Sequence, residues 1–438
     1  MRFLARLHSC GRVALGLTVG AITLPATAHA HATLLSSAPA DGARVKSGFG
    51  AIRLVFSEPV VSELSHVMLT GTDGVLHVVR LISDPRDIHA LVATPGILAD
   101  DSYRAEWHVI SADGHPVSGS FVFYVGSGSK TPLPAMHIPS AHKDGKAGGM
   151  EPAVAGAAIL PATLRGLALI PLLGLCGLLA FTSMSGAVTP GQMRLLSWLS
   201  VAATIMFALH YVEWLMHLSQ AHIWDPVIVK AAVVKNPGFN EGTRLVLVAM
   251  TVWAILLARR LKIAFAFALG AVLIGGAIGH PAAIVPLIAI PMKAIHLAGV
   301  AFWMGGLLWI ISADRNLADS IRAATTVSGL ALISISLVAV TGIVQSVLFL
   351  GEWSDLINSA YGVTVLLKVA GLIALGAFGA YHKRSLMPRL AASGDSTLRV
   401  SVRRELVVMA AVIMLGGFLA YVPTPPVKTS TGISASSH

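Results

Sequence analysis

Long apolar stretches dominate the chain from Ala153 to Val422. Eight of them are long enough to cross a bilayer as helices, a length of about 20 residues. They cover residues 153–182, 195–217, 243–258, 263–281, 291–312, 325–350, 360–381 and 402–422. This pattern predicts an α-helical membrane domain of about eight spans over residues 153–422.

The part of the chain before residue 126 has a period of two instead. Apolar and polar positions alternate along residues 103–110, so that Tyr103 and Trp107 share one face and Glu106 and His108 share the other. Several short segments of this kind, separated by turn residues, predict an antiparallel β-sandwich over residues 31–125. The alternation also places Phe121, Phe123 and Val125 in its core.

The remaining segments lack these periods. Residues 1–30 carry Arg2 and Arg6, then an apolar run, then Ala28-His29-Ala30, the pattern of a signal peptide. Residues 126–152 are rich in Gly, Ser, Pro and Lys and predict a flexible linker. Residues 423–438 form a polar tail, which we expect on the periplasmic side.

Composition and charge agree with a membrane protein. Charged residues make up 12% of the chain and hydrophobic residues 55%, whereas a soluble domain carries about 25% charged residues. Lys and Arg number twelve in the loops predicted to be cytoplasmic and five outside, the five being Lys230, Lys235, Arg244, Lys293 and Lys428. This bias predicts that the sandwich and both termini of the mature chain lie on the outer side of the membrane. We interpret the net charge of +10 as lysine and arginine residues that anchor the cytoplasmic loops, and we expect no nucleic-acid partner.

The mature sandwich offers ligands for Cu(II). Cleavage after Ala30 makes His31 the first residue, so its amine and its ring Nδ1 can chelate one metal ion. Asp113 and His115 flank a glycine in the loop between the last two strands. Three nitrogens and one carboxylate oxygen suit the tetragonal preference of Cu(II). Cys10 leaves with the leader and Cys176 lies in an apolar helix, so no disulfide forms within the mature chain. The alternative is an ordinary Asp-Gly turn with a solvated histidine, His31 being incidental.

Polar side chains in the apolar stretches lead to a second hypothesis. Placing such residues in lipid is unfavourable in free energy, so they indicate a functional role. Met206, His210, Glu213 and His217 lie along one helical stripe. A stripe of thioether, imidazole and carboxylate could pass copper stepwise, since thioether suits Cu(I) and imidazole suits either oxidation state. His280, His296 and Met304 would form a further path from the periplasmic side. The alternative is a polar helix contact in which Glu213 pairs with Arg165 or Lys368.

The sandwich resembles the CopC copper-binding proteins of the periplasm. The resemblance rests on His31–Ala43, Phe56–Val60 and Trp107–Gly119. It implies a cupredoxin-like Greek-key sandwich and Cu(II) ligation by His31, Asp113 and His115. His108 stands where the family leads us to expect arginine, and we interpret it as a surface residue. Met68 is the only methionine of the domain, so a Cu(II)-only domain is expected.

The helical part resembles the CopD family of copper-resistance and copper-import membrane proteins. The motifs are Gly279-His280, His296–Gly306, Thr341-Gly342 and Tyr361–Lys368, with a looser match over Tyr381–Arg389 and Arg404-Glu405. An Arg-Phe-Ser segment expected before the sixth span is absent, and Thr325–Ser328 stands there.

Together the resemblances imply a copper-handling protein of the inner membrane that is not an enzyme. The sandwich captures Cu(II), and the bundle imports copper as Cu(I) or Cu(II) in homeostasis or resistance. Expected partners are copper ions, the lipid bilayer and periplasmic copper donors or a reductant. No phosphate-binding loop is present to couple ATP. Three alternatives stay open: copper sequestration without transport, a haem-binding electron-transfer protein using pairs among His210, His217, His280 and His296, and a histidine-brace copper oxidase.

Overall fold

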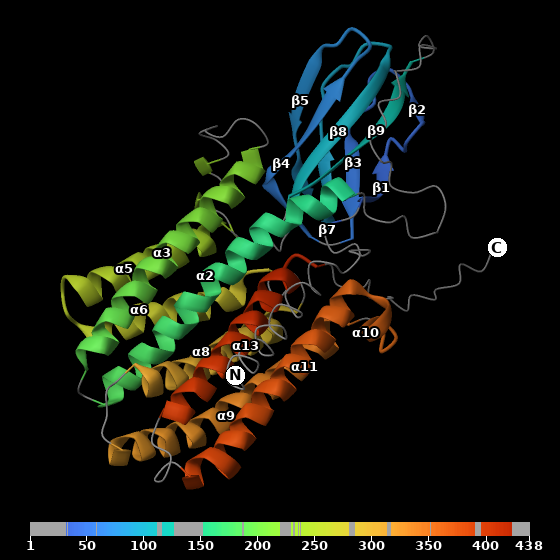
Figure 1. Ribbon diagram of the computed structural model, residues 1–438. Helices are drawn as coiled ribbons and strands as arrows, with labels where there is room; N and C mark the ends of the chain where they lie inside the picture. The colour runs from blue at the N-terminus through green and yellow to red at the C-terminus, as the bar shows by residue number, and fades with distance from the viewer. Residues whose placement is uncertain are drawn as a thin grey trace.

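The computed structural model shows a β-sandwich standing on one end of a helical bundle (Figure 1). It describes residues 32, 34–57, 59–111, 116–126, 152–185, 188–219, 229–230, 233–234, 236, 238–279, 285–312, 317–350, 352–389 and 396–422. The predicted signal peptide, almost all of the predicted linker and the tail lie outside these residues.

Two sheets face each other in the sandwich and confirm the predicted fold class. Neighbouring strands are antiparallel except for the short parallel pair of β2 and β9. One sheet has the order β1 (Leu34–Ala38), β3 (Ile52–Phe56), β7 (Asp87–Ala93) and β6 (Ile82–Asp84). The other has the order β2 (Arg44–Val45), β9 (Pro116–Val125), β8 (Ser102–Ser111), β4 (Val60–Thr70) and β5 (Leu76–Arg80).

The core between the sheets follows the alternation predicted from the sequence. Phe121, Phe123 and Val125 are buried, and the Trp107 ring meets Phe56 edge to face at 5.4 Å between centroids. Gly119 lies opposite Trp107 on β9. A Cβ atom at that glycine would lie 2.5 Å from Cζ2 of the indole. The strand pair therefore needs glycine there, because the indole lies across the neighbouring strand.

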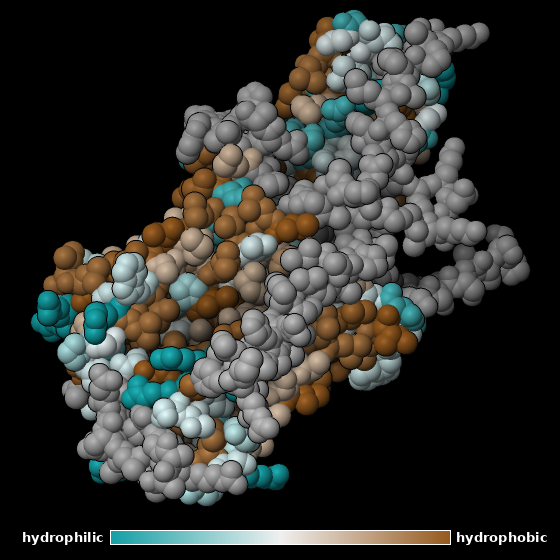
Figure 2. Space-filling view, viewed as in Figure 1, coloured by the Kyte–Doolittle hydropathy of each residue, from teal (hydrophilic) through white to brown (hydrophobic). Residues whose placement is uncertain are grey.

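In the described part of the chain, eight helices of 14 to 34 residues occupy the predicted apolar stretches and confirm the membrane class of the second domain. They are α2 (Pro152–Ser185), α3 (Pro190–Ser219), α5 (Gly238–Leu256), α6 (Leu261–Ile274), α8 (Pro286–Ile311), α9 (Leu317–Phe349), α11 (Ala360–Tyr381) and α13 (Ser396–Leu419). Within the described residues, six of them are long and apolar enough to span a membrane. The apolar helix around α6 is shorter, and α13 carries Arg403, Arg404 and Glu405 near its middle. Hydrophobic residues cover much of the visible bundle surface (Figure 2).

Helix α2 forms the centre of the bundle and contacts α3, α6, α8 and α13. Its closest neighbour is α8, because Gly177 and Gly305 meet at the crossing. A Cβ atom at Gly177 would lie 1.8 Å from the carbonyl oxygen of Ala301, and one at Gly305 would lie 2.0 Å from the Gly177 backbone. Small residues let helices in lipid approach in this way, so that backbone packing replaces side-chain packing.

Candidate functional site

One end of the sandwich rests on helix α3. Ile110 of β8 packs against Trp214, and both side chains are buried. The contact is completed by side chains of β4 and α3, namely Val61, Leu64, Tyr211 and Leu215. Ile110 pairs with Pro116 of β9, so this end of the β8–β9 strand pair meets the bundle. His31, Asp113 and His115 lie outside the described residues, and their predicted Cu(II) site stays a prediction.

A group of titratable side chains, five of them buried and Lys293 half-buried, lies below this contact in the half of the bundle nearer the sandwich. We call it the outer cluster: Arg165, His210, Glu213, Glu241, Arg244 and Lys293. His210 lies one turn before Trp214 on α3. Its Nε2 is 3.8 Å from Oε1 of Glu241, whose other oxygen is 3.9 Å from a guanidinium nitrogen of Arg244. The Nδ1 atom of His210 is buried and has no hydrogen-bond partner among the described residues.

Two cations of the outer cluster cap the end of the helical segment that contains α6. Arg244 donates from Nε to the Ala271 carbonyl at 3.0 Å, and its guanidinium lies 4.6 Å from the Phe207 ring centre. Lys293 donates from Nζ to the Ile278 carbonyl. Cations are favoured at the carbonyl end of a helix. Arg244 and Lys293 were predicted from the sequence to lie in the outside loops. That assignment was wrong, because both extend from helices into the bundle.

The predicted stripe on α3 is only partly assembled around this cluster. Glu213 and Arg165 both lie within electrostatic range of Tyr421, which brings the alternative partner Arg165 to the same region as Glu213. Met206 is half-buried and packs against the bundle core. The side chain of His217 lies outside the described residues, as does His280. The choice between a copper path and a polar helix contact therefore depends on His210 and Glu213.

His296 of α8 has a defined orientation. Its Nδ1 lies 3.0 Å from the Thr341 hydroxyl of α9, and that hydroxyl is 2.6 Å from the Leu337 carbonyl. Because the hydroxyl proton is used on the carbonyl, its oxygen accepts from Nδ1–H of the histidine. The Nε2 atom of His296 then carries the lone pair, the form of imidazole that binds a metal. Lys368 of α11 lies within electrostatic range of this ring.

The structure does not bring Met304 to His296. Met304 is buried against α2, where its methyl carbon would lie 3.3 Å from a Cβ atom at Gly174. His296 instead faces α9. Two residues that are eight positions apart on a helix differ in direction by about 80° around its axis. His296 and Met304 therefore face different neighbouring helices.

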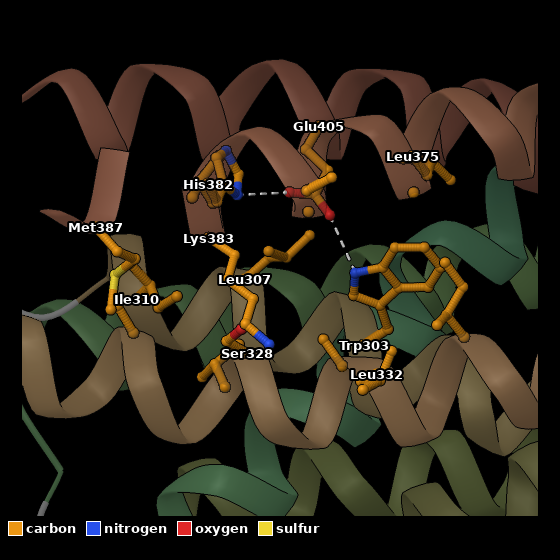
Figure 3. A pocket seen from close by; sticks show the side chains of 18 of the residues that line it. Trp303, Leu307, Ile310, Ser328, Leu332, Leu375, His382, Lys383, Met387 and Glu405 are labelled. Atoms are coloured by element: carbon orange, nitrogen blue, oxygen red, sulfur yellow. Dashed lines mark hydrogen bonds and ion pairs between the residues drawn. The ribbon is translucent and has the colours of Figure 1, made fainter. Parts of the chain in front are cut away.

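A cavity of about 260 Å³ lies near the end of the bundle opposite the sandwich (Figure 3). Trp303 donates from Nε1 to Oε1 of Glu405 at 3.0 Å, and Nδ1 of His382 lies 3.4 Å from the other carboxylate oxygen. Nε2 of His382 is 2.7 Å from the Ser401 hydroxyl, and the Met387 side chain also lines the cavity. We call this site the inner cavity. The sequence analysis assigned it no role, although the CopD-like segments contain Trp303, His382 and Glu405.

The described residues hold no group of three or more His, Cys, Asp or Glu side chains arranged as a metal site. Histidines with defined partners lie instead at two depths: buried His210 and half-buried His296 toward the sandwich, and half-buried His382 at the inner cavity. His296 and Trp303 lie about 10 Å apart along α8, at about 1.5 Å per residue. The class defined by this fold and these sites is a membrane protein with an extramembrane β-sandwich and buried ligand-type side chains in its bundle.

Comparison with known proteins identifies the family. The family profile described as CopC domain matches residues 34–126, and the one described as Copper resistance protein D matches residues 321–419. Copper resistance protein C of Pseudomonas syringae pv. tomato is 33% identical over 116 residues, which cover 25% of this chain and 91% of that protein. The chain therefore belongs to the CopC family through its N-terminal domain, and a CopD domain follows.

Two further relatives extend this comparison. Copper transport protein CutJ of Bacillus subtilis strain 168 is 25% identical over 428 residues, 92% of this chain and 76% of that protein. The crystal structure of CopC from Methylosinus trichosporium OB3b has 25% sequence identity and a TM-score of 0.21, covering 24% of this chain and 99% of that chain. The relatives are copper-resistance and copper-transport proteins.

Proposed function

We propose that this protein captures Cu(II) in the periplasm and imports copper across the inner membrane. His31, Asp113 and His115 would hold the ion, with the amine and ring of His31 acting as one chelate. The observation that carries the proposal is the contact between Ile110 and Trp214. It seats one end of β8, the strand that precedes Asp113 and His115 in the sequence, on the helix that bears His210.

Side chains that can bind copper follow one another through the bundle from the sandwich end to the opposite end. Copper released at the hairpin would meet His210 and Glu241 of the outer cluster, where an imidazole and a carboxylate are 3.8 Å apart. His296 follows, with Nε2 free for a metal because Thr341 occupies Nδ1. The inner cavity adds His382, Glu405 and the Met387 thioether toward the cytoplasmic end. Imidazole binds either oxidation state and thioether favours Cu(I).

The outer cluster also carries an electrostatic cost for a cation. Arg165, Arg244 and Lys293 all lie within electrostatic range of one another, against the carboxylates of Glu241 and Glu213. Arg244 and Lys293 are partly neutralised by the carbonyls that they cap. Copper would therefore bind best where carboxylate and imidazole meet, on the His210 side of the cluster.

The test is the copper content of the cytoplasmic and periplasmic fractions, measured by mass spectrometry in cells grown at limiting copper. Cells expressing the intact protein should gain cytoplasmic copper. His31→Ala and His296→Ala should abolish most of that gain. His77→Ala is the matched control, since His77 is an exposed histidine of the sandwich, and it should import like the intact protein.

Two results would reject import. An increase confined to the periplasmic fraction would favour sequestration, and equal copper in expressing and empty cells would reject transport altogether. A Soret band in the purified protein would support the haem alternative, and peroxide-dependent turnover of an added substrate would support the copper oxidase.

A further inference from the structure

Two histidines lie side by side on the outer face of the sandwich, apart from the predicted Cu(II) site. His66 of β4 and His108 of β8 are directly opposite each other in the antiparallel register. Their ring centroids are 5.1 Å apart and the ring planes differ by 30°. Opposed residues on neighbouring strands have Cβ atoms about 5 Å apart, so the backbone itself holds the two imidazoles together.

The neighbouring pair on the same face adds two more ligand types. Met68 lies opposite Glu106, two residues along each strand from the histidines. The period of two places these four side chains on one face as a square. All four are half-buried. The square thus combines two imidazoles, a thioether and a carboxylate.

His108 has a nitrogen that the described residues leave unused. Its Nδ1 is buried and has no hydrogen-bond partner there. A buried polar atom without a partner costs about 1–3 kcal/mol. A metal ion bound to the ring would give the imidazole a second interaction and fix its orientation.

The distance between the rings suits two ligands on one metal ion. A metal–imidazole bond is about 2 Å long, which puts the metal about 3 Å from each ring centre. Ring centres 5.1 Å apart are therefore close enough for one ion to bind a nitrogen of each ring after small side-chain rotations.

The square also lies beside the contact between the two domains. Ile110 follows His108 by two residues and shares its face of β8, and Ile110 packs on Trp214 of α3. An ion at the histidine pair would thus be held near the helix that leads into the outer cluster.

We propose that His66 and His108 form a second copper site of the sandwich, with the Met68 thioether as a third ligand. The proposal takes the class of metal from the proposed copper function but uses none of its residues. It departs from the expectation of a domain with one Cu(II) site, because a thioether beside two imidazoles accommodates Cu(I) as well.

The experiment counts copper bound to the full-length mature protein in detergent. Metal-free protein is dialysed against Cu(II), and separately against Cu(I) kept reduced by ascorbate, and bound metal is measured by mass spectrometry. His66→Asn/His108→Asn should lose about one equivalent in at least one oxidation state. His77→Asn, which removes an exposed histidine of the same sheet, should lose none. Unchanged copper in both states would overturn the site, and so would Zn(II) binding at the pair with copper excluded.

A second measurement separates this site from the proposed capture site. In His31→Ala/His115→Ala protein, Cu(II) electron paramagnetic resonance should retain a nitrogen-coordinated signal that disappears when His66 and His108 are also replaced. If His31→Ala/His115→Ala leaves the Cu(II) signal unchanged, the proposed capture site is rejected. The second site is still tested by the substitutions of His66 and His108. Amide hydrogen exchange of β4 and β8 in metal-free protein should be the same in the parent and the variants. A general loss of protection in the variants would mean that the copper was lost through unfolding. The assignment would then be rejected unless Met68→Leu alone also weakens copper binding.

Discussion

At the scale of single residues, the histidine pair makes sandwich stability depend on pH. Burial, and to a lesser extent the neighbouring His66, lower the pKa of His108 to about 4. Burial also lowers the pKa of His66. The charged residues on the adjoining positions are Arg80 opposite His66 and Glu106 on β8.

A lowered histidine pKa means that the unfolded chain binds more protons than the folded one between about pH 4 and 6.5. The stability from the neutral pair is therefore complete above about pH 6.5 and is lost as the pH falls toward 4. The expected loss is on the order of 1–2 kcal/mol after allowance for partial solvent contact. Hydrogen exchange of β8 in metal-free protein, corrected for intrinsic rates, should show this slope. His66→Asn/His108→Asn should flatten it, and a slope unchanged by that variant would contradict the assignment.

Residue patterns predicted the sandwich core well because a strand's faces are set locally by alternation. Phe121, Phe123 and Val125 were assigned to the core for that reason and are buried. The same reasoning gave no partner for His108, since the register of β4 against β8 depends on the whole sheet. Arg244 was misplaced for a related reason. A cation at the end of an apolar stretch can lie in a loop or can bind the end of a neighbouring helix inside the bundle. Only the packing of α5 against α6 determines which of the two Arg244 does.

At the scale of elements, the crossing of α2 and α8 should tolerate no added atom. Gly305→Ala places its Cβ atom about where the Gly177 backbone lies, so the helices must separate and lose packing along the crossing. We expect a loss of several kcal/mol, in the range of severe core changes, seen as poor yield and a lowered melting temperature in detergent.

Gly329→Ala is the matched control for this crossing. A Cβ atom at Gly329 of α9 meets nothing within 4 Å, and alanine favours a helix over glycine by about 1 kcal/mol. That variant should be as stable as the parent or slightly more so. Equal stability of both alanine variants would mean that the helices do not approach at Gly177.

The elements themselves were predictable because each long apolar run has one stable form in lipid, the helix. The polar contacts within the bundle were less predictable than the helices. The stripe from Met206 to His217 was predicted from spacing on one helix, whereas the structure pairs His210 with Glu241 of α5. Likewise, Glu405 meets Trp303 and His382 from two other helices. Such contacts join residues far apart in sequence, and spacing on one helix carries no information about them.

At the scale of the whole molecule, the two ends of the bundle should face opposite compartments. Wrongly counted loop charges do not weaken this inference. Removing Arg244 and Lys293 from the five outside charges leaves three, and removing Arg403 and Arg404 of α13 from the twelve inside charges leaves ten. The ratio of inside to outside charges therefore still rises. The sandwich and the end of α13 lie at the same end of the bundle (Figure 1). Sparse positive charge is what the periplasmic side of the membrane would carry, in line with the proposed capture of copper there.

Single cysteines can test this orientation because Cys176 is buried and Cys10 belongs to the predicted leader. The segment between α9 and α11 lies at the sandwich end of the bundle, and the start of α6 lies at the other end (Figure 1). Trp353 of that segment is 78% exposed, and Lys262 at the start of α6 is exposed. A membrane-impermeant maleimide added to spheroplasts should label Trp353→Cys at once and Lys262→Cys only after the membrane is permeabilised, as read by gel shift. The parent protein should stay unlabelled in both conditions. The reverse order of labelling would place the sandwich in the cytoplasm, where it could not capture periplasmic Cu(II), and the direction of transport proposed above would fail with it.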